Sequence, residues 1–183
     1  METVKYIVGA VGFLLIAWAW PGVAVAQLQA VEAEYGHGDS VDVFGVGFDF
    51  RDLKEWPLSP RWGLGVYLRG GVHYWKGQDD DSYLLDFGLT PVLRLQRNAP
   101  GRELLPYLEA GLGVHLLTET RINGHRELDT AFQFGEVLGL GIRFGPRHEY
   151  DLGLRLQHVS NGSISEHNDG LTFVSVGFAY HFN

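Results

Sequence analysis

The stretch Leu152-Gly-Leu-Arg-Leu-Gln-His158-Val-Ser160-Asn-Gly162, near the C-terminus, decides the class of fold. Successive side chains of a β-strand point to opposite sides of a sheet, so every second residue shares a face. On one face of this stretch, three leucines are followed by His158 and Ser160; the opposite face carries small, polar and charged residues. The pattern predicts a strand whose apolar face ends in an imidazole and a hydroxyl.

The same alternation recurs along most of the chain, in segments of roughly ten residues separated by turns. In the clearer segments, one face carries large apolar and aromatic residues and the other carries glycines mixed with charged residues. The first segment is the weakest of the set. Together with the opening stretch, seven further segments make eight predicted strands: 28–35, 44–50, 62–75, 83–95, 106–117, 130–144 and 172–182.

The two faces predict an all-β fold, an eight-stranded antiparallel transmembrane β-barrel formed by residues 27–183. Large apolar residues suit a lipid-facing exterior, and small or charged residues suit a narrow interior. A tilted strand of ~10 residues spans a bilayer, and closing the sheet leaves no unpaired edge in lipid. The alternative is a soluble β-sandwich or lipocalin-like barrel, in which the apolar face would line a ligand cavity. The residues expected to pair inside the barrel and fill it are Arg69, Arg94, Glu109, Arg143 and Arg155.

Residues 1–26 have the pattern of a secretory signal peptide. Lys5 precedes an apolar run from Ile7 to Trp20, and Ala24-Val-Ala26 supplies a small-x-small cleavage pattern. A membrane anchor is the alternative, but the run is shorter than the ~20 residues that a spanning helix needs. We therefore expect export and cleavage after Ala26.

Composition excludes several classes of function. The chain has 183 residues, a formal net charge of −8 and no cysteine. The acidic balance argues against a nucleic-acid partner, and the absence of cysteine excludes disulfides and thiol chemistry. The histidines have no spacing typical of a metal site, and Asp79-Asp-Asp81 lacks the ligand pattern of a calcium loop. We expect neither a metal nor a cofactor.

His158 and Ser160 have the chemistry of a base and a nucleophile. At spacing i, i+2 their Cα atoms lie ~6.6 Å apart on one face of a strand, and an imidazole can reach a hydroxyl over that gap. Asn161 and Gly162 follow directly and could stabilise an oxyanion. With both termini on the periplasmic side, this end of the strand lies at the outer leaflet. From the residues alone, a His-x-Ser pair at a strand end is more often a polar feature of a membrane interface that catalyses nothing.

A family resemblance bears on this choice. His158-Val-Ser-Asn-Gly162, followed by Asn168-Asp-Gly170 and a final strand, resembles the lipid A 3-O-deacylase (PagL) family. Further segments that resemble the family are Tyr74-Trp-Lys-Gly77, Thr90-Pro-Val92 and 106–114. The resemblance implies an eight-stranded outer-membrane barrel that hydrolyses the ester-linked 3-position hydroxyacyl chain of lipid A in lipopolysaccharide.

The resemblance also assigns roles to residues. It implies a Ser–His–Glu triad on the outer surface of the barrel, with Ser160 as nucleophile and His158 as general base. Asn161, Gly162 and Asn168 would belong to the loop that shapes the oxyanion site.

The third member of the triad departs from the family's pattern. The family's glutamate would stand two residues after Gly170, where this chain has Thr172. The alternation places Thr172 on the outward face, where its hydroxyl can accept the imidazole N–H but supplies no negative charge. Glu166 and Asp169 are nearby carboxylates that could substitute, and a Ser–His dyad without an acid is the other possibility.

Three functions follow from these observations. The first is a lipid A deacylase, a carboxylic ester hydrolase. The second is a non-catalytic outer-membrane barrel with a degenerate site, which binds lipid or a surface partner. The third is a soluble periplasmic ligand carrier. Whether the chain forms a homodimer is left open.

Overall fold

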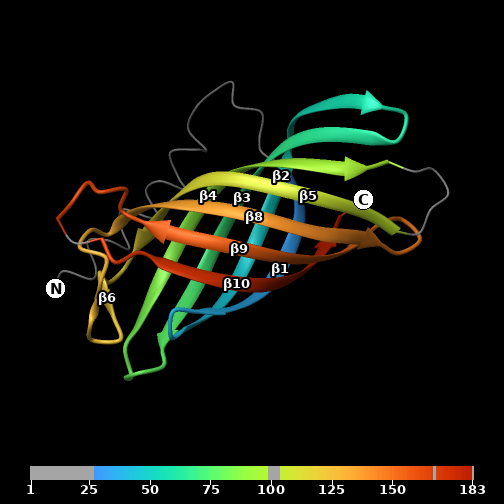
Figure 1. Cartoon of the computed structure of the whole chain (residues 1–183). Helices are drawn as coiled ribbons and strands as arrows, with labels where there is room; N and C mark the ends of the chain where they lie inside the picture. The colour runs from blue at the N-terminus through green and yellow to red at the C-terminus, as the bar shows by residue number, and fades with distance from the viewer. Residues whose placement is uncertain (1–26, 99–103, 167, 183) are drawn as a thin grey trace.

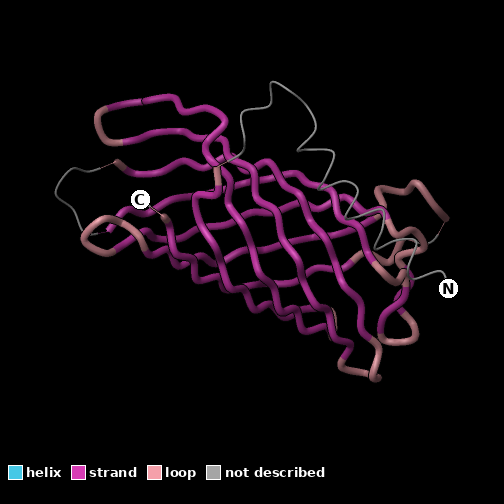
Figure 2. Tube along the Cα trace, turned by 180° about the vertical axis from the view of Figure 1, so that it is seen from behind, coloured by secondary structure: helices cyan, strands magenta, loops and turns pink. Residues whose placement is uncertain are grey.

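The chain folds into a closed barrel of eight antiparallel strands (Figures 1 and 2). The computed structural model describes residues 27–98, 104–166 and 168–182, so the predicted signal peptide at 1–26 lies outside the described residues. Within these ranges, no helix is long and apolar enough to cross a membrane. The barrel strands are β1 (Leu28–Gly38), β2 (Val41–Ser59), β3 (Trp62–Gly77), β4 (Tyr83–Arg97), β5 (Leu104–Leu117), β8 (Phe132–Phe144), β9 (Tyr150–Ser160) and β10 (Leu171–His181).

The strands follow one another around the barrel in chain order, and β10 pairs with β1 to close it. The eight-stranded all-β architecture predicted from the alternation is therefore confirmed. Strands β6 (Arg121–Ile122) and β7 (Arg126–Glu127) form a separate small hairpin in the connection between β5 and β8. Elements of two residues are too short to produce a periodic pattern, so the sequence did not predict them.

Strand β2 is much longer than the segment 44–50 that the alternation predicted. Its register against β3 shifts between Phe50 and Lys54, and the strand then continues to Ser59. The bulge breaks the period of two, which is why the alternation ended at Phe50. The resulting β2–β3 hairpin projects beyond the barrel (Figure 1).

The two faces of the sheet divide as the sequence predicted. In β10, Val174, Val176 and Phe178 point outward and are about half exposed, whereas Ser175 and Ala179 are buried inside the barrel. The same alternation recurs in β5, β8 and β9. An apolar exterior around a polar interior is the pattern of a barrel that lies in lipid.

Glu109 is the centre of the ion-pair network that fills the middle of the barrel. Its carboxylate lies 2.7 Å from Arg155 Nε, 2.8 Å from Arg94 Nη2 and 3.2 Å from Arg69 Nη1. The predicted interior pairing of these four residues is confirmed. Arg143 lies outside this network, and its guanidinium donates a hydrogen bond of 2.9 Å to the His148 carbonyl in the β8–β9 turn.

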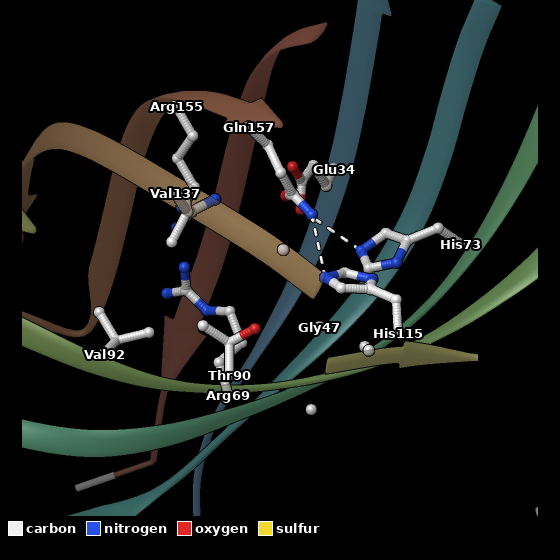
Figure 3. Close-up of a pocket in the computed structure, with 14 residues that line it drawn as sticks. Glu34, Gly47, Arg69, His73, Thr90, Val92, His115, Val137, Arg155 and Gln157 are labelled. Carbon is white, nitrogen blue, oxygen red and sulfur yellow. Dashed lines mark hydrogen bonds and ion pairs between the residues drawn. The ribbon is translucent and has the colours of Figure 1, made fainter. Parts of the chain in front are cut away.

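A second layer of polar side chains lies next to this network inside the barrel (Figure 3). Asp86 accepts hydrogen bonds of 3.1 Å from His73 Nδ1 and 2.9 Å from His115 Nδ1, and Gln157 lies 3.4 Å from the His115 ring. The cavity left between these side chains and Arg155 is about 30 Å³. A cavity of that size holds about one water molecule, so the interior at this level is not a channel.

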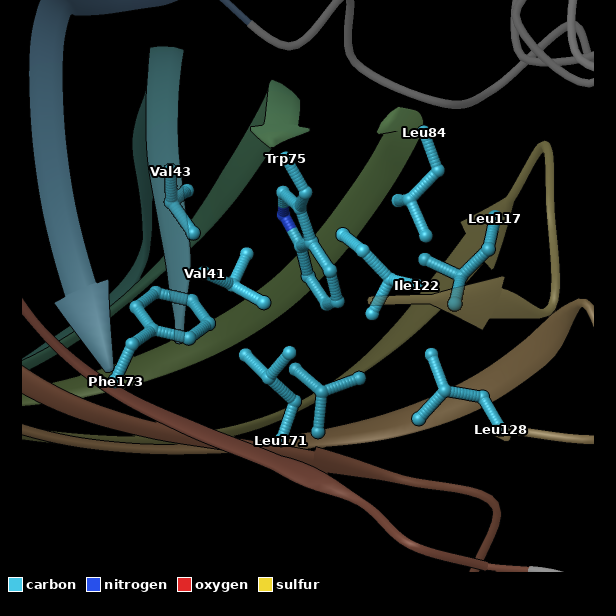
Figure 4. Packing of buried hydrophobic residues seen from close by; sticks show 10 residues of the cluster. Val41, Val43, Trp75, Leu84, Leu117, Ile122, Leu128, Leu171 and Phe173 are labelled. Carbon is cyan, nitrogen blue, oxygen red and sulfur yellow. The ribbon is translucent and has the colours of Figure 1, made fainter. Parts of the chain in front are cut away.

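One end of the barrel is closed by an apolar plug (Figure 4). The plug packs inward-facing residues of six barrel strands against two residues from the connection that carries β6 and β7. We call this the loop end, because the β6–β7 hairpin and the β9–β10 connection also lie there, opposite the end of β10 (Figure 1). The plug consists of Val41, Val43, Trp75, Leu84, Leu117, Ile122, Leu128, Val159, Leu171 and Phe173.

The central network predicts a large effect of neutralising Glu109. Glu109→Gln leaves three buried guanidinium groups without their shared carboxylate, and removing one partner of a buried ion pair costs roughly 3–5 kcal/mol. We expect the barrel, refolded in detergent, to unfold at a lower urea concentration. Unfolding is measured by the change in gel migration between the folded and the unfolded barrel. The control is Asp81→Asn, which removes one charge from an exposed loop. Equal midpoints for the two variants would contradict the central role of Glu109.

Candidate functional site

The candidate site is a row of outward-facing side chains that crosses three neighbouring strands. His158 of β9 is paired with Thr172 of β10 on one side and with Glu136 of β8 on the other. Directly opposite residues of an antiparallel pair have Cβ atoms ~4.5–5.5 Å apart. The prediction that Thr172 faces outward beside the site is confirmed. Glu136 was not predicted as a site residue.

The plug fixes the inner side of these strands. Val159 lies between His158 and Ser160 and is completely buried, and Leu171 and Phe173 flank Thr172 in the same way. Each site residue is therefore held by neighbours whose side chains are packed inside the barrel. The site consequently stands on rigid strands at the loop end, with its chemistry on the outer surface.

A hydrogen bond sets the orientation of the His158 ring. His158 Nδ1 and Thr172 Oγ1 are 2.8 Å apart. The adjacent Cε1–Nε2 edge of the ring lies over Gly170, where an added Cβ would come within 2.9 Å of Cε1 and 3.4 Å of Nε2. Gly170 precedes the Leu171–Val159 pair, so this edge points toward the loop end, the direction in which Ser160 follows His158.

Ser160 lies on the same face as His158, one alternation closer to the loop end. These two described residues form no hydrogen bond with each other. Catalytic hydrogen bonds are often long until a substrate binds. The neighbour of Ser160 on β8 is Phe134, whose ring packs edge-to-face on Phe132 at 5.1 Å between centroids. Two packed aromatic rings therefore lie on the β8 side of the Ser160 hydroxyl.

The loop after Ser160 is tied down by two asparagines. The Asn161 N–H donates a hydrogen bond of 2.9 Å to Asn168 Oδ1. The Asn161 side chain is completely buried and donates to the Leu128 carbonyl at 3.2 Å. Gly162 has φ of +64° and begins the turn. The Asn161 side chain therefore anchors the loop from inside, while Asn168 keeps its NH₂ group available as a donor.

The two carboxylates that follow Ser160 in sequence differ in their surroundings. Asp169 Oδ2 accepts a hydrogen bond of 2.7 Å from the Glu127 N–H, which ties it to the β6–β7 hairpin. Glu166 is exposed on the loop. It is Thr172 that contacts His158. The group in contact with the imidazole is thus a neutral hydroxyl.

Two further charged residues lie beside this row. Arg126 donates a hydrogen bond of 2.6 Å to the Gly170 carbonyl, and Asp39 accepts one of 2.7 Å from the Thr172 N–H. Arg126 and Asp39 also approach each other to 3.8 Å. They bind the backbone of the site strand and partly neutralise each other. Among the described residues, no group of three or more His, Asp and Glu side chains is arranged to hold a metal ion.

Comparison with known proteins gives consistent matches over most of the chain. Residues 42–181 match the family described as lipid A 3-O-deacylase (PagL). Lipid A deacylase PagL of Bordetella bronchiseptica is 30% identical over 166 residues, which cover 87% of this chain and 89% of that protein. Its counterpart from Pseudomonas aeruginosa is 29% identical over 155 residues, which cover 84% and 87% of the two chains.

A solved structure agrees with the fold. The crystal structure of the outer membrane enzyme PagL matches with a TM-score of 0.75 at 26% identity, covering 84% of this chain and 99% of that one. The closed barrel, its apolar exterior and this likeness identify the chain as an outer-membrane protein.

The loop anchor predicts a local effect of removing the Asn168 side chain. Asn168→Ala deletes the acceptor of the Asn161 N–H, and one hydrogen bond contributes about 1 kcal/mol, or roughly fivefold in a local opening equilibrium. We expect roughly fivefold faster amide exchange over residues 161–170, measured by hydrogen exchange and mass spectrometry. Ser163→Ala, an exposed change in the same loop, serves as the control. Unchanged exchange in the Asn168 variant would mean that the loop is held by other contacts.

Proposed function

Because the chain belongs to the lipid A 3-O-deacylase (PagL) family, we propose that it hydrolyses the ester-linked 3-position hydroxyacyl chain of lipid A. The observation that carries the proposal is the outward-facing His158–Ser160 pair, with its imidazole held by Thr172. With the loop end at the cell surface, this pair meets the outer leaflet. The substrate ester would then reach the site without leaving the membrane.

The first chemical step is acyl transfer to Ser160. With Nδ1–H donating to Thr172 Oγ1, His158 Nε2 is the free base and takes the proton of the Ser160 hydroxyl. The serine oxygen bonds to the ester carbonyl carbon and forms a tetrahedral oxyanion. The bond from that carbon to the 3-oxygen of lipid A then breaks, and the imidazolium returns its proton to the leaving oxygen.

The second step is hydrolysis of the acyl-serine. His158 takes a proton from water, and the resulting hydroxide bonds to the acyl carbon. The bond to the serine oxygen breaks, and the proton on the imidazolium returns to Ser160. The products are a free hydroxy fatty acid and lipid A with a free 3-hydroxyl, so neither a cofactor nor an oxidant is consumed.

The loop after Ser160 is the proposed source of oxyanion donors. The Asn168 NH₂ group remains as a donor because the carboxamide oxygen is bound to the Asn161 N–H. The turn at Gly162 exposes backbone in the same region. Preorganised donors of this kind stabilise the charge that develops on the carbonyl oxygen and are often the largest single contribution to catalysis.

The apolar face next to the site suits an acyl chain. Leu138, Leu156 and Val174 form the next outward row below His158, and each is about half exposed or more. Phe134 lies beside Ser160 at the loop end of this surface. An acyl chain can therefore lie along β8 and β9 with its ester at the hydroxyl.

The direct test of the proposal is removal of the nucleophile. We expect Ser160→Ala to lower 3-O-deacylation of lipid A on the order of 10³-fold or more, as loss of a serine nucleophile does in other enzymes. The measurement is mass spectrometry of lipid A incubated with the purified barrel in detergent. Ser163→Ala is the matched control, because it removes a hydroxyl from the adjacent loop.

A folded wild-type barrel that leaves lipid A unchanged would favour the second function, a non-catalytic barrel with a degenerate site. Deacylation that survives in the Ser160 variant would place the nucleophile elsewhere.

Thr172 is expected to contribute through its hydroxyl. Thr172→Val keeps the shape of the side chain but removes the acceptor of His158 Nδ1–H, so the ring loses its orientation. Loss of one neutral hydrogen bond in the transition state corresponds to about a tenfold fall in kcat/KM. The check is the initial rate of fatty-acid release, with Thr172→Ser expected to stay near the wild-type rate. Equal rates for the valine and serine variants would remove Thr172 from the mechanism.

A further inference from the structure

Glu136 of β8 is an outlier on the lipid-facing surface. The side chains of β8, β9 and β10 that point outward are otherwise apolar, aromatic or the site residues themselves. Among these outward-facing residues of the described strands, Glu136 is the one carboxylate. Ionisable residues on lipid-facing surfaces are rare because they are costly, and they commonly mark functional sites.

The sheet register places Glu136 next to His158, the proposed general base. Glu136 and His158 are directly opposite partners in the β8–β9 pair, and His158 and Thr172 are directly opposite partners in the β9–β10 pair. Cβ atoms at such positions are ~4.5–5.5 Å apart. A glutamate carboxylate is joined to Cβ through one further methylene group, Cγ, and this length lets it reach the imidazole of the residue opposite. The Glu136 side chain is exposed, and its carboxylate forms no hydrogen bond or ion pair with any other described residue.

We propose that Glu136 is the acid of this site, acting on His158 from β8 while Thr172 orients the ring from β10. The inference rests on the proposed deacylase function. In a Ser–His–acid triad the acid both holds the imidazole tautomer and stabilises the imidazolium. Here the two tasks are divided: Thr172 Oγ1 accepts the Nδ1–H at 2.8 Å, and Glu136 supplies the negative charge. Glu136 is thus a positioning residue that acts through His158 and does not touch the substrate.

The other charged groups around His158 do not supply that charge. Arg126 and Asp39 lie on the β10 side, where they bind the Gly170 carbonyl and the Thr172 N–H and approach each other to 3.8 Å. Asp169 is bound to the Glu127 N–H. On β8, Glu136 is the residue directly opposite His158, and on β9 itself the outward neighbours are Leu156 and Ser160.

The lipid environment strengthens the effect of this charge. A carboxylate and an imidazolium interact more strongly where water is excluded, because the effective dielectric constant is low. The same surroundings make an isolated carboxylate unfavourable, so Glu136 is stabilised when His158 becomes protonated. Proton transfer from Ser160 to His158 therefore creates the pair that the row is arranged to hold.

The experiment compares four variants of the full-length barrel. Glu136→Gln and Glu136→Leu both remove the charge, and the leucine variant suits the lipid-facing surface, so folding does not limit it. Leu112→Gln is the matched control, because Leu112 of β5 lies on the other side of Glu136 in the same outward-facing row, so this variant places an amide in lipid one strand farther from His158. Glu136→Gln combined with Thr172→Glu moves the charge from β8 to the family's position on β10.

Two readouts are measured against pH. The first is kcat/KM for 3-O-deacylation of lipid A, and the second is the rate at which a fluorophosphonate probe labels Ser160, with Ser160→Ala as the blank. We expect both charge-removing variants to lose on the order of 10²-fold in each readout, which lies within the range for general acid–base groups. The pH profile of each readout should change in both Glu136 variants and not in Leu112→Gln, because only the Glu136 variants remove a negative charge beside the imidazolium. The double variant should recover at least tenfold.

The outcomes separate this inference from the function it rests on. If wild type does not deacylate lipid A but labelling of Ser160 still depends on Glu136, the proposed substrate fails and the role of Glu136 stands. If Ser160→Ala abolishes deacylation while both Glu136 variants stay within twofold of wild type with unchanged pH profiles, the role of Glu136 is overturned. A loss in Glu136→Gln that Leu112→Gln reproduces would equally overturn it, since the effect would then come from an amide in lipid.

Discussion

A closed sheet of eight strands in a bilayer leaves each side chain only two directions, and the rest of this structure depends on that constraint. Inward-facing groups share a space that side chains alone can fill, so charges there must pair with one another. Glu109 accordingly meets three arginines within 3.2 Å. Outward-facing groups meet hydrocarbon and must be apolar unless they have a task. A polar residue that faces outward is therefore informative.

The same constraint explains how a catalytic group can stand on a smooth outer wall. Neighbouring strands align their outward residues in rows, so a site needs one residue from each of a few strands and no dedicated cleft. The plug residues Val159 and Leu171 hold the strands from the inside, and the Asn161–Asn168 contact holds the loop above them. Precision in this site comes from strand packing inside the barrel, which lies on the opposite side of the sheet from the chemistry.

Alternation of side chains is a property of each strand by itself, so it predicts strands and their two faces but not which strands pair. It identified eight strands, their two faces, the interior arginines and the outward position of Thr172. It ended β2 at Phe50 because a bulge interrupts the period. Alternation within one strand could not show that Glu136 stands opposite His158, because β8 and β9 are brought into register by hydrogen bonds between separate strands. The roles of the site residues came from the family resemblance, and the sequence near Ser160 directed the search for an acid toward Glu166 and Asp169.

In the proposed site, Thr172 stands where the family resemblance implies a glutamate, and this can be understood once the two tasks of a triad acid are separated. Orientation requires a short hydrogen bond with fixed geometry, and the 2.8 Å contact from Thr172 meets it without any charge. Stabilisation of an imidazolium requires a negative charge nearby. The strength of this interaction depends on distance and dielectric constant, so the charge can be carried by either neighbouring strand. In a barrel, His158 has a neighbour on each side, so the hydrogen bond and the charge can come from opposite directions. A neutral residue at the family's acid position is therefore compatible with an active site as long as the other side of the row carries a carboxylate, as β8 does with Glu136.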